Sequence, residues 1–403
     1  MLKILYINAM GPRRNTPLGG IFVSQRILAL KKMGVDIIPV NAGITYSPVT
    51  RLLLGLKNIH DGGNLAAKQL GVHYQVIRAE MNLLDTWRTR TGSKSYEKVL
   101  YRQMYRQLEQ ICDADLIHLH WCWPVGLIVL RLALEKNIPY VLTFHGSDIN
   151  IQLQSPVIRP DLLNLMERAA SVEFISNALL ERAVVSGYSG KNAAVIYNGI
   201  DTGIFFRRPG KKEKKCVGFV GNLIPVKGAD RLPAIFWKIK EKCKVEPIFV
   251  IVGQGVLEGE LREKLKGLPV TFTGQLLPDK LSEVYSHMDV LVVPSRSEGY
   301  SCVIKEAQAC GVVPVGNDAG GIREAVGRYG SVVASPDEKE LAECLAREAC
   351  GYLEGKLAVN LDEMAKEAQG CSWVKRQEQS LLNYERIRKE SSKVNGNRQI
   401  HSQ

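Results

Sequence analysis

Residues 290–311 have the sequence VLVVPSRSEGYSCVIKEAQACG. The apolar run VLVV predicts a buried strand, and Cys302–Cys310 predicts a helix that ends at Gly311. Glu298 therefore lies on a loop at the carboxyl end of a strand, and Glu306 lies in the helix that follows. In open α/β sheets, this edge is where ligands bind.

The two carboxylates are eight residues apart, which corresponds to roughly 12 Å along a helix. That distance is too long for two groups that share one water molecule. It suits two groups that grip opposite ends of an elongated polyhydroxyl ligand. The alternative is a surface helix with ordinary glutamates, and the spacing alone does not decide between the two.

The bulk composition is that of a soluble globular protein of two or three domains, at about 150 residues a domain. The chain has 403 residues, of which 45% are hydrophobic and 23% charged. No apolar run reaches the roughly 20 residues that cross a bilayer. The first residues, Met1–Asn8, are too few for a signal peptide and predict a first strand. We therefore expect a cytoplasmic protein.

The nine cysteines are scattered and form no C-x-x-C pair. This pattern predicts reduced thiols rather than a disulfide framework or a zinc site. His118, His120 and Cys122 lie close together in sequence, but three such residues on one strand do not make a metal site. We therefore predict no metal.

The formal net charge of +12 is concentrated in the first half of the chain. Residues 1–200 carry 22 Lys/Arg and 14 Asp/Glu, a balance of +8, and the remainder carries 31 and 27, a balance of +4. A basic face there could meet nucleic acid, an anionic membrane or a phosphorylated substrate.

Short apolar segments alternate with helical patterns along the chain, which predicts parallel sheets covered by helices. The predicted strands include 35–40, and the predicted helices include a single one over 95–112. The charged segment 206–215, which contains Pro-Gly, is a linker candidate. We therefore expect an α/β protein with two Rossmann-like, doubly wound parallel-sheet domains facing a cleft, an arrangement that suits a two-substrate reaction. The predicted domains are 1–205 and 206–372, followed by a helix at 373–389 and a flexible tail at 390–403.

Two glycine-containing loops are candidates for phosphate binding. In VGNLIPVKG (220–228), a glycine permits close approach, a helix start favours anions, and Lys227 supplies a charge. In PLGGIFV (17–23), Gly19 and Gly20 precede a helix and allow the same approach. For either loop the alternative is a plain turn. In that case Lys227 of the first loop is a solvated side chain without a ligand.

His145 lies in the segment TFHGSD (143–148), at the end of a predicted strand, and would face the cleft. There it could donate a hydrogen bond to a sugar hydroxyl, although a lone histidine is more often structural. His118 and His120, with the neighbouring tryptophans, could form part of an acceptor wall. GQGVLE (253–258) follows a strand but has Glu258 where a dinucleotide fingerprint has its third glycine.

Together these motifs resemble the family 4 glycosyltransferases, which have the GT-B architecture. The resemblance covers nearly the whole chain and is strongest over 217–326. Besides the loops above, it rests on the carboxylate pair and on two further segments, AQACGVVPV (307–315) and GGIREAV (320–326). The segment IFVSQ (21–25) is more particularly similar to the branch that builds bacterial surface polysaccharides, including teichuronic-acid enzymes.

The resemblance implies a retaining, metal-independent transferase of hexosyltransferase type that uses a nucleotide-sugar as donor and needs no cofactor. It implies that Lys227 binds the donor phosphates and that Glu306 holds the ribose. Glu298 would hold the sugar, assisted by the backbone around Gly299, Tyr300 and Ser301. Gly320 and Gly321 would lie near the nucleotide, His145 near the anomeric carbon and Gly20 near the phosphate. The terminal helix would pack back on the first domain.

One residue departs from the family pattern. Asn222 stands where the family usually has arginine, and an amide can bond a phosphate oxygen but brings no charge. Lys227 would then carry the phosphate charge largely alone, or another Lys or Arg would substitute. We include Asn222 among the predicted donor-binding residues.

The expected acceptor is a lipid-linked or polysaccharide glycan, with the protein cytoplasmic or peripheral on the inner face of the membrane. In 96–111, apolar residues recur at helical spacing, while Lys94, Lys98, Arg102 and Arg106 line another side. This helix could lie on anionic lipid, or it could face the core and leave its basic side solvated.

Two alternatives from other classes remain. One is a nucleotide-sugar epimerase, a nicotinamide-dependent oxidoreductase or another nucleotide-binding enzyme on the same two-domain architecture. The other is a basic scaffold for nucleic acid, for which the sequence has no recognition motif. We therefore expect no nucleic-acid partner.

Overall fold

The chain divides into two compact units in a computed structural model that describes residues 1–11, 19–54, 71–89, 93–208 and 214–400. Unit 1 comprises Met1–Tyr197 together with the chain from Trp373 onward, and unit 2 comprises Asn198–Ser372. The side chains of residues 88–96 and 392–400 are not described.

The boundary between the units precedes the predicted one at 205/206. The intervening residues pack on unit 2, because Ile200 bridges to Ser372 and the carbonyl of Ile204 accepts a hydrogen bond from Ser282 at 2.6 Å. Residues 209–213 of the predicted linker lie outside the described residues.

Unit 1 contains one sheet of seven strands in the part of the chain that the structure describes, and each neighbouring pair is parallel. The order is β3-β2-β1-β4-β5-β6-β7, so the direction of strand addition reverses between β1 and β4. The strands are β1 (Lys3–Asn8), β2 (Asp36–Tyr46), β3 (Gln75–Met81), β4 (Leu116–His120), β5 (Tyr140–Phe144), β6 (Ser171–Phe174) and β7 (Ala193–Val195).

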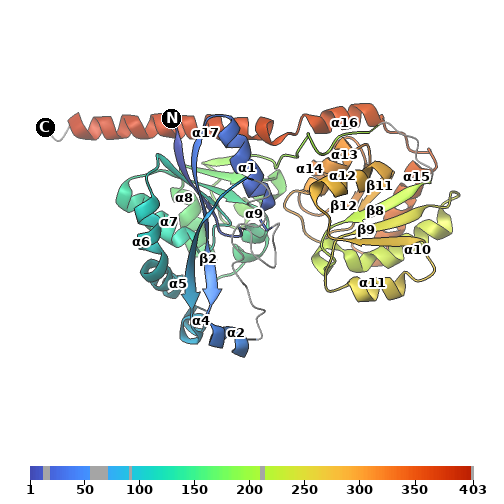
Figure 1. The fold of residues 1–403 in the computed structure, drawn as a ribbon, viewed down its shortest axis with the longest axis horizontal. Helices are drawn as coiled ribbons and strands as arrows, with labels where there is room; N and C mark the ends of the chain where they lie inside the picture. The colour runs from blue at the N-terminus through green and yellow to red at the C-terminus, as the bar shows by residue number, and fades with distance from the viewer. Residues whose placement is uncertain (12–18, 55–70, 90–92, 209–213, 401–403) are drawn as a thin grey trace. The chain divides into compact units, whose positions relative to one another are not determined.

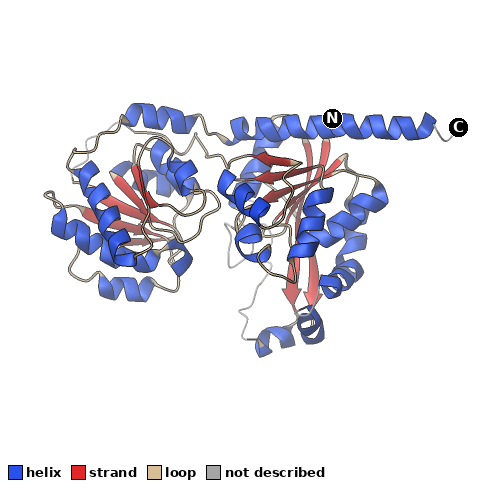
Figure 2. Cartoon of the chain, turned by 180° about the vertical axis from the view of Figure 1, so that it is seen from behind, coloured by secondary structure: helices blue, strands red, loops and turns tan. Residues whose placement is uncertain are grey.

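Helices cover both faces of this sheet (Figure 2). The helices of unit 1 are α1 (Ile21–Lys32), α2 (Pro48–Leu53), α4 (Leu83–Thr89), α5 (Ser93–Leu100), α6 (Arg106–Ile111), α7 (Gly126–Lys136), α8 (Arg159–Arg168), α9 (Asn177–Val185) and α17 (Trp373–Ile400).

Two elements of unit 1 differ from the predicted ones. The single helix predicted over 95–112 is α5, a π-helical segment at Tyr101–Tyr105, and α6. Strand β2 is longer than the predicted strand at 35–40, because its second half pairs with β3 as far as Tyr46 opposite Met81.

Unit 2 repeats the architecture with six parallel strands, counted over its described residues, in the order β10-β9-β8-β11-β12-β13. The strands are β8 (Cys216–Val220), β9 (Ile248–Val252), β10 (Val270–Gly274), β11 (Val290–Val293), β12 (Val313–Asn317) and β13 (Ser331–Val333). The helices are α10 (Leu232–Lys242), α11 (Glu258–Lys264), α12 (Pro278–His287), α13 (Cys302–Ala309), α14 (Ile322–Val326), α15 (Glu338–Leu353) and α16 (Leu361–Gln369).

The structure therefore confirms the predicted fold class, two Rossmann-like parallel-sheet domains. In unit 2 the apolar faces of α10 and α15 pack on β8, β9 and β11, through residues such as Phe236, Leu345 and Val292. This buried apolar surface is the main stabilising contribution in such a layer structure. The cleft expected between the domains stays a prediction.

The last helix, α17, packs on unit 1 beside α1 (Figure 1). Tyr384 and Ile387 of α17 join the core that β1 and α1 form. The helix continues to Ile400, through most of the segment predicted as a flexible tail, because its residues contain no proline and few strong helix breakers. Residues 401–403 lie outside the described residues.

In the described part of the chain, no helix combines the length and the apolar content needed to cross a membrane.

Candidate functional site

Two loops of unit 2 leave the sheet where its strand order reverses, between β8 and β11. The loop after β8 contains Asn222 and Lys227, and the loop after β11 contains Glu298. Ligands of open α/β sheets bind outside the carboxyl ends of the strands at such a reversal. The topology thus brings together two motifs that are about seventy residues apart in the sequence.

Gly228 allows these two loops to touch. The chain passes from a short 3-10 turn, Pro225–Lys227, through Gly228 in the left-handed region, with φ of 68°. A Cβ atom at Gly228 would lie 1.9 Å from the carbonyl oxygen of Pro294. Only glycine fits this contact, because both the backbone conformation and the space exclude a side chain. The helix predicted to open near Gly228 begins at Leu232, after a second 3-10 turn.

An ion pair joins the two loops at their tips. Lys227 Nζ lies 2.7 Å from Glu298 Oε1. The hydroxyl of the buried Ser295 also donates to Glu298 Oε1, at 3.0 Å. Glu298 is buried, whereas Lys227 is partly exposed. Both of these contacts to the carboxylate are to Oε1, and the structure gives Oε2 no hydrogen-bond partner among the described residues.

Two arginines, Arg231 and Arg296, link the same loops through hydrogen bonds and ion pairs. Arg296 donates to both carboxylate oxygens of Asp230, at 2.7 and 2.8 Å. Arg231 donates to the carbonyl oxygen of Pro294 at 2.6 Å and pairs with Glu338. The paired arginines fix the loops as one block, as bidentate contacts do. All three cations of these loops are thus paired with carboxylates, Lys227 with Glu298, Arg296 with Asp230 and Arg231 with Glu338.

Glu306 lies in α13, in a partly buried position. Burial raises the pKa of its carboxyl from 4.5 to about 7, partly offset by a hydrogen bond from the Tyr285 hydroxyl at 3.4 Å. At neutral pH the carboxyl therefore exists in both protonation states. It can donate to a hydroxyl or accept from one.

The start of α13 lacks a side-chain cap. Ser301 precedes the helix, and its side chain makes no capping hydrogen bond. The Ser301 hydroxyl is buried and has no partner among the described residues. Tyr300 is buried and Gly299 partly buried, so they shape the loop between Glu298 and the helix. Unsatisfied amides at a helix start attract negative charge.

Gly320 and Gly321 lie directly against the Glu298 loop. Gly320 has φ of 57°, and a Cβ atom there would lie 2.0 Å from the carbonyl oxygen of Glu298. The Gly321 amide donates to the same oxygen at 3.3 Å. Gly320 and Gly321 therefore hold Glu298, the residue predicted to bind the sugar, in place through its backbone carbonyl. Asn222 is exposed at the rim of the site.

In unit 1, His145 follows β5 but its ring lies inside the unit. Its Nε2 atom is 2.8 Å from Nδ1 of His120, and the ring stacks on Trp121 with a centroid distance of 4.3 Å. Nδ1 of His145 is buried and has no partner in the part of the chain that is described. Burial, together with the charge of Arg26, lowers the pKa of His145 well below 6.5, so the ring is neutral at pH 7.

Gly20 ends the loop that enters α1. It has φ of 63°, and a Cβ atom there would lie 2.8 Å from the side chain of Asn8 at the end of β1. Gly19 precedes it and is partly buried. Residues 17 and 18 of the predicted motif lie outside the described residues.

A buried polar network beneath His145 escaped the sequence analysis. Arg26 of α1 donates to Glu173 of β6 at 2.6 Å, and both side chains are fully buried. Glu173 also accepts from Thr143, whose hydroxyl lies 2.7 Å from Nε2 of His118. The other members come from α17: Gln377 and Ser380 bond Arg26, and Tyr384 bonds His118.

This network gives His118 a structural role. Strand β4 ends at His120, and Cys122 lies 3.8 Å from the carbonyl of Leu119, so the three residues do not converge. Among the described residues, no group of three or more His, Cys, Asp or Glu side chains is placed to hold a metal ion.

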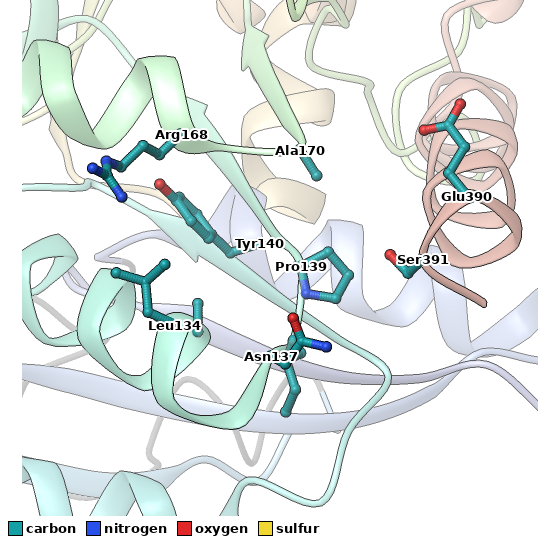
Figure 3. A pocket seen from close by; sticks show the side chains of 10 residues that line it. Leu134, Asn137, Pro139, Tyr140, Arg168, Ala170, Glu390 and Ser391 are labelled. Carbon is teal, nitrogen blue, oxygen red and sulfur yellow. The ribbon is translucent and has the colours of Figure 1, made fainter. Parts of the chain in front are cut away.

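A hollow of about 340 Å³ lies at the other edge of the unit 1 sheet, before β5 (Figure 3). Tyr140, Arg168 and Glu390 are among its lining residues. The Tyr140 hydroxyl is satisfied by the carbonyl of Leu165 at 2.7 Å. The hollow is on the opposite edge from His120 and His145, so it does not belong to the candidate site.

Within unit 2 the structure thus brings together Lys227, Glu298, Gly320 and Gly321, with α13 leading away to Glu306. Sequence reasoning missed Ser295, which lies three residues before Glu298 and bonds it directly. Its position just after a buried strand was the available signal.

Two family models match the chain, one in each half. The model for Glycosyltransferase Family 4 matches residues 83–203, and the model for group 1 glycosyl transferases matches residues 214–348. The second range contains the residues of the candidate site in unit 2, from Asn222 to Gly321.

Similar proteins include the glycosyltransferase TuaC of Bacillus subtilis (strain 168), assigned to teichuronic acid biosynthesis. It is 28% identical over 367 residues, which are 86% of this chain and 89% of TuaC. Anabaena HepE, solved with UDP and glucose, has a TM-score of 0.66 at 18% identity, over 94% of this chain and 98% of HepE. Sucrose-phosphate synthase from Thermosynechococcus elongatus has a TM-score of 0.65 at 20% identity, over the full length of both. These structural likenesses establish the fold.

Proposed function

The chain belongs to the family 4 glycosyltransferases, and on that premise we propose that it transfers a sugar from a nucleotide-sugar to an acceptor hydroxyl with retention of anomeric configuration. The product would be a cell-surface glycan. The observation that carries the proposal is the Lys227–Glu298 pair at the strand reversal of unit 2, beside a helix start that lacks a side-chain cap.

Each residue of this site has a place in the proposal. Lys227 and the amides at the start of α13 bind the diphosphate, because a lysine and a helix start both stabilise anions. Glu298 accepts from a sugar hydroxyl through Oε2, and Glu306 bonds the ribose. In the unliganded protein Lys227 and Glu298 neutralise each other, so the donor phosphate must draw the lysine away.

The proposed reaction needs no protein nucleophile. The bond from the anomeric carbon to the phosphate oxygen breaks, and a bond to the acceptor oxygen forms on the same face. The acceptor hydroxyl gives its proton to the departing phosphate. Lys227 stabilises the charge that develops on this phosphate, the kind of contribution worth about 10²–10³ in rate. We propose that this charge is met without a metal ion or other cofactor.

The relatives suggest which substrates to try first. HepE was solved with UDP and glucose, and TuaC is assigned to teichuronic acid biosynthesis. We therefore propose a uridine-linked hexose as donor and a lipid-linked or polysaccharide glycan as acceptor. A cytoplasmic enzyme, peripheral on the inner face of the membrane, would meet both. His145 and Gly20 of unit 1 are proposed to contact the sugar and the phosphate.

Ligand-induced thermal shift of the full chain tests the donor class. We expect UDP or GDP to raise the melting temperature of the wild type, and Lys227→Ala to lose that rise. Lys238→Ala is the matched control, since Lys238 of α10 pairs with Glu343 of α15 and not with a residue of the site. A rise with NAD or an oligonucleotide instead would favour the oxidoreductase or the nucleic-acid scaffold and contradict the proposal.

A further inference from the structure

Six apolar side chains are exposed on two short helices at one end of unit 1. We name this surface the α2–α4 tip; it consists of Val49, Leu52, Leu53, Leu83, Leu84 and Trp87. Leu52 is 82% exposed and Trp87 is 65% exposed. A contiguous exposed apolar patch on a folded protein marks an interaction surface.

Strand pairing explains why the two helices meet. β2 and β3 are parallel neighbours, and their pairing ends with Tyr46 opposite Met81. α2 starts at Pro48 and α4 at Leu83, so each helix begins directly after its strand. The Ser47 amide also donates to the Met81 carbonyl at 3.0 Å. Figures 1 and 2 both show the helices side by side at this end.

The charge around the tip is positive. The sequences PVTRLL and LLDTWRT contain one acidic residue, Asp85. Asp85 is buried, accepts from the Asn82 amide, and lies 3.7 Å from Arg102. Arg51 of α2, Lys98 of α5 and Arg102 stay accessible beside the apolar side chains.

The basic helical segment 93–111 supplies only the charge of this surface. Its apolar residues Val99, Leu100, Met104 and Leu108 are buried in unit 1. The apolar side of the segment therefore faces the core. This is the second of the two alternatives that its sequence left open. The apolar surface comes instead from α2 and α4.

We propose that the α2–α4 tip docks on an anionic lipid membrane. Leucine side chains enter the boundary between headgroups and acyl chains, and tryptophan is favoured at that depth. The cations beside the tip meet anionic headgroups. The cations Arg51, Lys98 and Arg102 beside the tip outnumber the neighbouring acids Glu80, which is exposed, and Glu97, which is partly buried, and this balance favours an anionic lipid surface.

The docking surface stands apart from the chemistry of unit 2. It draws on the proposed function only in that a lipid-linked acceptor would then lie near unit 1. The test therefore contains neither donor nor acceptor, so failed transfer and failed docking are separate results.

Sedimentation with vesicles of equimolar phosphatidylglycerol and phosphatidylcholine tests the proposal. We expect the full-length wild type to bind, more weakly at high salt and on phosphatidylcholine alone. The variant Leu52→Ser/Leu84→Ser/Trp87→Ser should bind at least about tenfold more weakly, because it removes the inserted side chains. Val185→Ser is the matched control, since Val185 is 88% exposed at the end of α9. All four positions are exposed, and unchanged melting temperatures confirm intact folds.

Tryptophan fluorescence reports insertion directly. Trp87→Phe should keep binding but lose the blue shift that vesicles cause, whereas Trp237→Phe, in α10 of unit 2, should keep both. Equal binding by the triple variant and the wild type would overturn the proposal. So would an absence of vesicle binding, or self-association that the triple variant abolishes without any vesicle binding.

Discussion

Ser295 contacts both loops of the candidate site in unit 2. Its hydroxyl donates to Glu298 Oε1 at 3.0 Å and lies 3.4 Å from the carbonyl oxygen of Lys227. In the proposed function the donor phosphate draws Lys227 away, and Ser295 would then be left to hold the carboxylate. A positioning role for Ser295 follows from this geometry.

Ser295→Ala should therefore weaken binding of a nucleotide-sugar about tenfold while leaving binding of the nucleoside diphosphate unchanged. A hydrogen bond to a charged group contributes about 1.5–3 kcal/mol, and only the sugar depends on Glu298. Calorimetric titration with both ligands measures the difference, and Ser295→Thr should restore it.

Ser282→Ala is the matched control for this experiment. Ser282 is equally buried in unit 2 and also donates one hydrogen bond, to Ile204, but it lies away from the loops. The role assigned to Ser295 is wrong if Ser282→Ala weakens binding of the nucleotide-sugar, relative to the nucleoside diphosphate, as much as Ser295→Ala does.

Glu306 should make unit 2 less stable as pH rises. Burial raises its pKa to about 7, so the folded state keeps the proton above pH 4.5, where the unfolded chain loses it. The free energy of unfolding therefore falls between pH 4.5 and 7, and the full penalty remains above pH 7. Glu306→Gln should raise the melting temperature at pH 8 and have little effect at pH 4.5.

Glu283→Gln, an exposed carboxylate of α12, is the control for the pH series. A gain for Glu306→Gln that is equal at both pH values would show that the carboxyl is not held in the neutral form.

At the residue scale, the sequence predicts single residues better than their partners. Glu298, Gly228 and Gly320 belong to local motifs, and strand ends place them at one edge. The contacts of Ser295 with Lys227 and of Arg26 with Glu173 join residues 68 and 147 positions apart. Local periodicity carries no information about such pairs.

At the scale of elements, α17 is tied to unit 1 by buried polar groups as well as apolar packing. Gln377 and Ser380 bond Arg26, whose guanidinium pairs with Glu173 in the sheet. Arg26→Met should destabilise unit 1 by about 3–5 kcal/mol, because it leaves a buried carboxylate without its partner. Denaturant unfolding of the full chain measures this change.

The double variant Arg26→Met/Glu173→Met separates the pair from its surroundings. With both charges removed, it should lose less stability than the sum of the two single variants. Additive losses would mean that the ion pair contributes nothing beyond each residue's other contacts.

The elements that differ from prediction differ for physical reasons. The helix predicted over 95–112 contains a π-helical segment, at which Met104 and Tyr105 are buried. Strand β2 extends because β3 offers a pairing partner that the sequence of β2 alone does not reveal. By contrast, α13 follows its pattern closely, since its buried residues recur on one face and Gly311 follows it with φ of 81°.

At the scale of the whole molecule, the alternation of strands and helices was sufficient to predict two parallel-sheet units. The boundary was harder to place, because the charged, Pro-Gly-containing segment 206–215 has the stronger linker signal, whereas 198–205 packs on unit 2 through its own backbone. The excess positive charge of the first half pointed to an anionic partner without showing which surface would meet it. The α2–α4 tip could be identified only from the structure, in which the pairing of β2 with β3 brings α2 and α4 together.

The proposed function requires that the loops of unit 2 bind and activate a nucleotide-sugar. Release of nucleoside diphosphate from a panel of UDP- and GDP-linked sugars, in the presence of bacterial lipid-linked glycan, tests it most directly. We expect one donor to be consumed by the wild type and by Lys238→Ala, and consumption by Lys227→Ala and Glu306→Ala to fall at least about 100-fold with the fold intact. Wild-type turnover in either of these two variants would show that Lys227 and Glu306 do not bind the donor.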